Sequence, residues 1–169
     1  MPSIHKEICE ICLKSEVFCP VCEEKLRKGK LEKIDIEVAK FLESLKEKFK
    51  VLKDAQIYKV VKTNENIIII ARKGDASKII GRNGTIAKLL SKEFKQPVKV
   101  IEFSEDLKEF LNNLVFPASI EGINILYKRD GEIKYKIRIP ESYVKRIDEN
   151  LVKQVVETIF EKPIEIVVV

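Results

Sequence analysis

The chain has 169 residues, of which 45% are hydrophobic and 35% are charged at neutral pH. The hydrophobic content is sufficient for a buried core and excludes a disordered chain. The longest purely apolar run, residues 67–71, is far shorter than the roughly 20 residues that cross a bilayer. The first ten residues, MPSIHKEICE, lack the apolar centre of a secretory signal. We therefore expect a cytoplasmic protein that does not bind a membrane.

Basic residues are concentrated in one segment of the chain. The overall net charge is +5, yet residues 71–100 contain eight Lys or Arg and two acidic residues, a net charge of +6. The rest of the chain is therefore slightly acidic. This distribution is expected either for a surface that faces a polyanion or for a solvated, Lys-rich helix face. A binding motif inside the segment is needed to decide between the two.

All four cysteines lie in residues 1–33, which we predict to form a small zinc knuckle or ribbon. Cys9 and Cys12 form one CxxC pair, and Cys19 and Cys22 form another after six intervening residues. Each CxxC turn presents two thiolates to one ion, so the two pairs complete a single structural Zn²⁺ site with no open position. Because so short a segment buries little surface, the metal would supply its stability.

Other uses of these cysteines remain open from the spacing. Iron could replace zinc, and disulfides could replace a metal, although a reducing compartment argues against disulfides. The only histidine, His5, precedes Cys9 by four residues. Because it lies near the terminus, we expect it to be exposed rather than a further ligand.

Residues 34–103 alternate between helical and strand patterns. A helix is predicted from Asp35, its N-cap, through Phe49, and strands at residues 55–61 and 66–72 follow it. Asp75 is expected to cap a short helix, and a second helix opens at Thr85 and precedes a strand at residues 98–103. Between these two helices lies the sequence Gly81-Arg82-Asn83-Gly84, which we call the GxxG loop.

This loop and its surrounding elements resemble a KH domain of the type II topology. The order is helix, strand, strand, helix, GxxG, helix, strand, with Ile79-Ile80 directly before the loop. Glycines let a sugar–phosphate backbone approach the main chain, and the amides that open the second helix favour an anion. Arg82 adds a charge and Asn83 can donate to phosphate. The resemblance implies that this loop clamps about four nucleotides of single-stranded RNA.

The resemblance also implies which neighbours of the loop contact the RNA. Ile79, Ile80 and Ile86 would form an apolar groove floor under the bases, or simply pack in the core. Lys78 and Lys88 would be charges on the groove rim, or simply solvated. The complete predicted RNA-binding set is Lys78, Ile79, Ile80, Gly81, Arg82, Asn83, Gly84, Thr85, Ile86 and Lys88.

Residues 104–169 repeat the pattern of the central unit. A helix, a hairpin with Asp130-Gly131 at its turn, two short helices and a final strand are predicted. At an offset of 66 residues FKQPVKV matches FEKPIEI, which indicates two copies of one fold. In place of the GxxG loop this copy has Ile147-Asp148-Glu149-Asn150, whose side chains block close approach and whose acids repel phosphate. We therefore predict a degenerate KH-like unit.

The expected fold class is α+β, with a four-cysteine zinc module at residues 1–33 followed by two type II KH-like units at 34–103 and 104–169. Tandem type II KH units resemble archaeal NusA-like transcription factors. The module containing ICLKSEVFCPVCEEKL resembles the N-terminal zinc ribbon of archaeal KH proteins described as NusA-like.

The resemblance implies a protein that binds single-stranded RNA in transcription elongation or termination, or in ribosome-linked RNA metabolism, with RNA polymerase or the ribosome as partner. The alternative is a zinc-dependent adaptor that docks on polymerase or ribosome and contacts RNA only secondarily. We do not expect an enzyme, because the sequence has no P-loop, no open metal site and only one histidine for acid–base chemistry.

Overall fold

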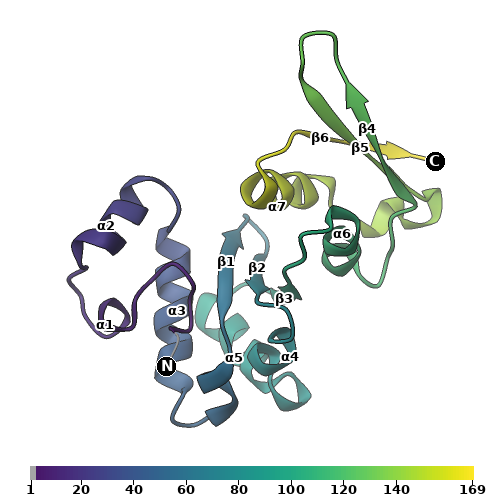
Figure 1. The fold of residues 1–169 in the computed structure, drawn as a ribbon. Helices are drawn as coiled ribbons and strands as arrows, with labels where there is room; N and C mark the ends of the chain where they lie inside the picture. Colours follow the sequence, from purple (N-terminus) through teal and green to yellow (C-terminus); the bar gives the residue numbers. More distant parts are fainter. Residues whose placement is uncertain (1–2) are drawn as a thin grey trace. The chain divides into compact units, whose positions relative to one another are not determined.

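The computed structural model describes residues 3–169, so the first two residues of the N-terminal module lie outside it. It divides into two compact units, one ending at Phe103 and the other beginning at Ser104. Each unit contains a three-stranded sheet with helices packed against it (Figure 1). The fold is therefore α+β, with a four-cysteine module ahead of two KH-like units, as predicted. None of the helices within residues 3–169 is long and apolar enough to cross a bilayer.

The four-cysteine module consists of two short helices. Helix α1, Glu10–Leu13, was not expected from the sequence, and α2, Pro20–Arg27, begins with a proline at its first position. The segment before α1 is attached to the first sheet by main-chain hydrogen bonds. The amide of Lys6 donates a hydrogen bond to the carbonyl oxygen of Ile57 at 2.8 Å. The amide of Ile57 in turn donates to the carbonyl oxygen of Ile4 at 2.7 Å. The module is therefore built onto the edge of this sheet.

The sheet of the first unit has the strand order β1-β2-β3. Strand β2 pairs with β1 in antiparallel orientation and with β3 in parallel orientation. All five residues of β2 are buried, and α3 and α5 contribute apolar faces to the same core. The elements are α3 (Lys33–Leu45), a 3-10 turn (Lys50–Asp54), β1 (Ile57–Lys62), β2 (Ile67–Ala71), α4 (Ala76–Ile80), a 3-10 turn (Arg82–Gly84), α5 (Thr85–Phe94) and β3 (Val98–Glu102).

The second unit repeats this topology with the order β4-β5-β6, again with one antiparallel and one parallel pair. Strand β6 lies 66 residues after β3, and α5 and α7 both end at a left-handed residue, Lys95 and Glu161 respectively. The two short helices expected here are a 3-10 helix and the twelve-residue α7. The elements are α6 (Leu107–Val115), β4 (Gly122–Tyr127), β5 (Ile133–Ile139), a 3-10 helix (Glu141–Arg146), α7 (Glu149–Phe160) and β6 (Ile164–Val168).

Candidate metal centre and nucleic-acid interface

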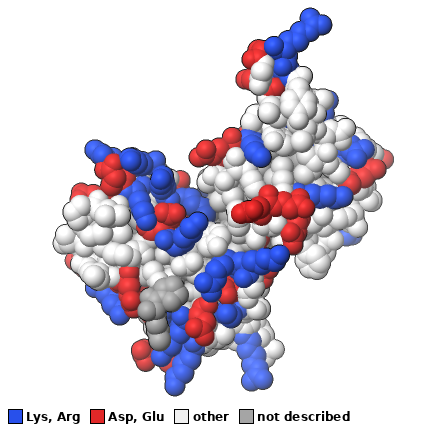
Figure 2. Space-filling model, viewed as in Figure 1, with Lys and Arg blue, Asp and Glu red and all other residues white. Residues whose placement is uncertain are grey.

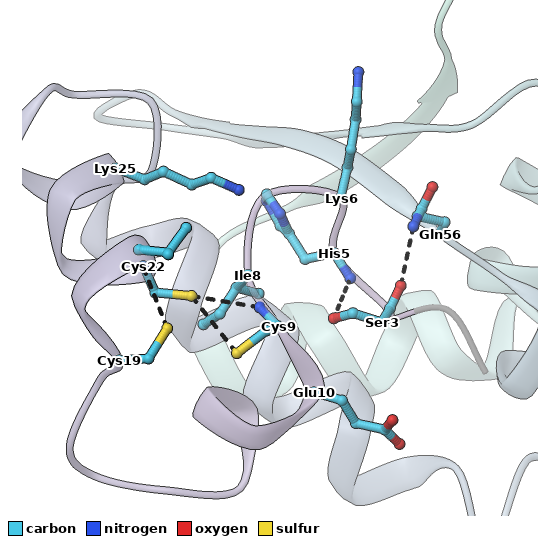
Figure 3. Close-up of a pocket in the computed structure, with 11 residues that line it drawn as sticks. Ser3, His5, Lys6, Ile8, Cys9, Glu10, Cys19, Cys22, Lys25 and Gln56 are labelled. Carbon is cyan, nitrogen blue, oxygen red and sulfur yellow. Dashed lines mark hydrogen bonds between the residues drawn. The ribbon is translucent and has the colours of Figure 1, made fainter.

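The four cysteines converge although they come from different turns. Their Sγ atoms all lie within 4.8 Å of one another, and those of Cys9 and Cys22 are 3.8 Å apart. Figure 3 shows the side chains of Cys9, Cys19 and Cys22 pointing toward one another. A tetrahedral zinc with Zn–S bonds of about 2.3 Å requires sulfur atoms about 3.8 Å apart. All four are free thiols, and the cluster can accept a four-coordinate metal with shifts of about 1 Å or less in its sulfur atoms.

Hydrogen bonds from main-chain amides favour the ionised form of two of these thiols. The Cys22 amide donates to the Sγ atom of Cys19 and lowers its pKa to about 7. The Cys12 amide likewise lowers the pKa of Cys9. Burial raises the pKa of Cys22. The Cys19 amide favours the Cys12 thiolate, but burial and the neighbouring thiols outweigh it and raise the pKa of Cys12 to about 12. A bound cation would supply the positive charge that is needed to stabilise Cys12 and Cys22 as buried thiolates.

His5 is not exposed, contrary to our expectation. It is fully buried, and its Nε2 atom lies 2.9 Å from Oδ1 of Asp35, which is also fully buried. Asp35 is not the N-cap of α3, since that position belongs to Glu32. Instead its carboxylate also accepts hydrogen bonds from the Nζ atom of Lys59 and the amide of Val60, both at 2.7 Å. This polar network joins the N-terminal segment to α3 and β1.

The network keeps Asp35 charged. Burial opposes the charge, but hydrogen bonds from His5, Lys59 and the Glu32 amide outweigh burial and lower the pKa of the Asp35 carboxyl. Sequence reasoning missed the contacts with His5 and Val60 because these residues lie 30 and 25 positions away from Asp35, outside the range of helix-capping patterns.

The shape of the GxxG loop depends on its first glycine. Gly81 has φ +79° and ψ 170°, a conformation that essentially only glycine adopts. A Cβ atom at this position would lie 2.8 Å from Cγ1 of Ile86 and 3.1 Å from its amide nitrogen. Gly84 also has a positive φ, +71°, but a Cβ atom there would meet open space. Asn83 between them is left-handed as well, with φ 56°.

The GxxG loop leads directly into α5, which begins without a side-chain cap. The N-cap position is Gly84, so within residues 3–169 this helix has no side-chain cap. In the second unit the matching position is Asp148, whose Oδ1 atom accepts hydrogen bonds from the amides of Asn150 at 3.0 Å and Leu151 at 3.2 Å. In the first unit the 3-10 turn runs directly into α5, the Thr85 amide donates to the carbonyl of Arg82, and the N-cap position carries no side-chain acceptor. The second unit places its own carboxylate at the equivalent position.

Comparison with known proteins finds similar sequences and similar solved structures. No family model matches the chain. It is 29% identical over 75 residues to the probable transcription termination protein NusA of Methanococcus vannielii, and 27% identical over 75 residues to that of Methanocaldococcus jannaschii. Each match covers 44% of this chain, and 43% and 41% of the relatives. The chain thus spans about two-fifths of the length of the relatives it matches.

The chain is similar to archaeal NusA-like proteins. The crystal structure of APE1850 has the same fold, with a TM-score of 0.59 and 22% identity, over 76% of this chain and 95% of that chain. The similarity in fold thus extends well beyond the 75 residues that match the curated relatives.

The remaining residues of the predicted RNA-binding set differ in accessibility. Arg82, Asn83, Thr85 and Lys88 are exposed, and Ile80 is partly exposed. Ile79 and Ile86 are fully buried, so they support the loop from beneath.

Lys78 is held by the neighbouring acid Asp75. Its Nζ atom lies 3.1 Å from Oδ1 of Asp75, and Nε of Arg72 lies 2.7 Å from the other oxygen. Asp75 itself is buried and does not cap α4 with its side chain as we predicted, because its carboxylate accepts the Gln56 amide at 3.0 Å. Two bases of the basic segment are therefore partly neutralised.

The four-cysteine module presents apolar side chains to solvent. Ile11, Val17 and Val21 have exposed fractions of 78%, 80% and 64%. Figure 2 shows an uncharged area over the lobe that carries α1 and α2 in Figure 1. We call these three residues the knuckle patch. A small domain does not need such residues for its own stability, so they favour a contact with another molecule.

Proposed function

We propose that this protein binds single-stranded RNA at the GxxG loop, with a phosphate against the uncapped start of α5. The observation that carries the proposal is the contrast between Gly84 and Asp148, since only the first unit leaves its helix amides without an internal carboxylate. Arg82 and Asn83 are exposed at the tip, where they can contact the phosphates, and Lys88 lies one turn into α5. The bases would lie over Ile80, above the buried Ile79 and Ile86.

The names of the two relatives support a role in transcription, so we propose that the RNA held at the loop is a transcript. RNA polymerase is then the expected protein partner, and the protein would act by holding the transcript rather than by catalysis. The N-terminal module would be stabilised by one Zn²⁺ ion held by Cys9, Cys12, Cys19 and Cys22, in agreement with their spacing. The metal would be structural, because four thiolates leave no position for a substrate.

The test is a fluorescence anisotropy titration of short single-stranded RNA with wild-type protein and with Arg82→Asp/Asn83→Asp. The variant keeps both glycines, so the loop geometry is retained while the tip becomes repulsive. A matched control, Arg146→Asp/Asn150→Asp, makes the same charge change at the corresponding edge of the second unit. We expect the first variant to lose most of its affinity and the control to retain it. Equal binding by wild type and both variants would refute the proposal.

A second candidate function is favoured by the knuckle patch. The module would then act as a protein-interaction adaptor that docks on RNA polymerase, with RNA contact secondary. Replacing Ile11, Val17 and Val21 by Ser should abolish co-purification with polymerase from nuclease-treated extract. Val51→Ser, which changes a residue with an exposed fraction of 45% in the same unit, should not. Polymerase recovery that depends on RNA and not on the patch would argue against the adaptor.

A further inference from the structure

The central strand of the second sheet separates apolar from basic side chains. Along β5, Ile133, Tyr135, Ile137 and Ile139 alternate with Lys134, Lys136 and Arg138. Successive residues of a strand point to opposite faces, so the three bases share one face. Ile137 and Ile139 are buried, as are Val152, Val155 and Val156 of α7. Figure 1 shows α6 and α7 on one side of this sheet, so the three bases lie on the side that faces away from these helices.

The neighbouring strands leave room for these bases. Gly122 pairs with Arg138 across β4 and β5, and a Cβ atom on Gly122 would lie 2.5 Å from Nη2 of Arg138. The guanidinium therefore lies across the bare main chain of the glycine. Its Nε atom is buried and has no hydrogen-bond acceptor in the described part of the chain. An unpaired buried donor is uncommon, so part of the hydrogen-bonding capacity of this guanidinium is unused within the described residues.

Opposite charge is scarce on this face. The outward positions of β4, β5 and β6 hold three bases and a single acid, Glu165, whose Oε2 atom lies 3.0 Å from Nζ of Lys134. Lys134, followed by Lys136 and Lys153, lowers the pKa of the Glu165 carboxyl, so several cations share this one carboxylate. The matching strand of the first unit, β2, is entirely apolar and buried. The repeat of the fold therefore does not require bases at these positions.

We propose that Lys134, Lys136 and Arg138, which we call the basic sheet face, bind the phosphate backbone of RNA. The proposal rests on the proposed function, because the ligand is a longer stretch of the RNA held at the GxxG loop. Alternate residues of a strand lie about 6.6–6.8 Å apart, a spacing comparable to that of neighbouring phosphates in an extended single strand. The face offers three cations and no exposed aromatic anchor, although Leu126 lies opposite Lys134, and this predominance of positive charge favours phosphates as the ligand.

This site also explains what the second unit contributes. Its helix start is closed by Asp148, so it cannot clamp a phosphate in the manner proposed for the first unit. Contact through a basic sheet face needs no GxxG loop and carries no sequence preference, because phosphates are the same in every RNA. The unit would increase affinity for longer RNA without adding base recognition.

The test compares a short RNA, which fills only the GxxG loop, with a single strand several times longer. Lys136→Gln/Arg138→Gln removes two bases from the face, and Lys145→Gln/Arg146→Gln removes two exposed bases elsewhere in the same unit as a matched control. For the long RNA we expect the first variant to lose affinity on the order of tenfold at 0.1 M salt. Its slope of log K against log salt should fall by about 1.4, since each phosphate contact in single strands contributes about 0.7.

The outcomes separate this inference from the proposed function. If wild type binds the short RNA, and both double variants bind the long RNA equally well, the basic sheet face is not a binding site and the loop proposal stands. If wild type does not bind the short RNA, the loop proposal is wrong. In that case, if wild type binds the long RNA and Lys136→Gln/Arg138→Gln does not, the result still supports the basic sheet face as a binding site. Because Arg138 packs over Gly122, Lys136→Gln alone serves as a second variant and should reduce the slope by about 0.7.

Discussion

Replacing Gly81 by alanine tests whether the GxxG loop has the conformation that the proposed RNA contact requires. The residue combines a φ of +79° with a ψ of 170°, a region in which other residues are strained by about 1–3 kcal/mol. The new Cβ atom would also lie 2.8 Å from the side chain of Ile86 and 3.1 Å from its amide nitrogen. Ile86 is fully buried, and its main chain belongs to α5, so it cannot move away freely.

Overpacking of a buried site typically adds about 1–3 kcal/mol. Gly81→Ala should therefore reduce the free energy of unfolding by about 2–6 kcal/mol in total. Gly84→Ala is the matched control, because its Cβ atom would meet open space and only the left-handed backbone, about 1–2 kcal/mol, opposes it. Urea unfolding followed by circular dichroism, with the metal site saturated, measures both. If Gly81→Ala is no more destabilising than Gly84→Ala, the loop does not have this geometry.

Three further predictions concern the metal, the buried network and the second helix start. Metal analysis should find one zinc per chain, and chelation or acid should release it and lower the melting temperature, because protons compete for the thiolates. Intact stability after complete removal of the metal would contradict a structural role. The lowered pKa of Asp35 means that its stabilisation is fully present above its unfolded pKa of about 3.9 and is lost as the pH falls through the folded value. Asp35→Asn should lose that pH dependence and about 3–5 kcal/mol of stability at neutral pH, measured by denaturant titration, since it leaves Lys59 and His5 without their carboxylate. Asp148→Ala should reduce the free energy of unfolding by about 1 kcal/mol, because it removes the side-chain cap of α7. Asp106→Ala removes the equivalent cap of α6 and should have a similar effect.

Local rules predicted the helices and strands well where the determining residues are adjacent in sequence. The start of α5 was predicted at Thr85, because Gly84 precedes it, and Pro97 follows its end at Phe94. The three strands of the first sheet were located to within two residues at each end. The convergence of the four cysteines was also predictable, since the CxxC spacing already places two thiols in one turn.

The predictions that were wrong involve polar groups with distant partners. Asp35 was assigned as the N-cap of α3, a position that Glu32 occupies, whereas Asp75 is at the N-cap position of α4 as assigned but makes no side-chain cap hydrogen bond. In the structure they accept hydrogen bonds from the amides of Val60 and Gln56, on or beside β1. His5 was expected to be exposed because it lies near the terminus, yet pairing with Ile57 brings it into the core. No sequence pattern within one turn encodes these contacts, since the folded sheet creates them.

The two units show how one fold can deal with the same helix start in two ways. The first amides of a helix need acceptors, and the second unit provides Asp148, a solution that is stable without a ligand. The first unit instead has Gly84 there, preceded by Asn83 and Gly81 in conformations with positive φ. Glycine adopts such conformations at little cost, and asparagine tolerates the left-handed region better than most residues. Gly84 is left-handed, with φ +71°, whereas Asp148 is extended, with φ −81°, so an aspartate could not replace Gly84 without a change of backbone. The anion that we propose for the first unit would take the place that the Asp148 carboxylate occupies in the second.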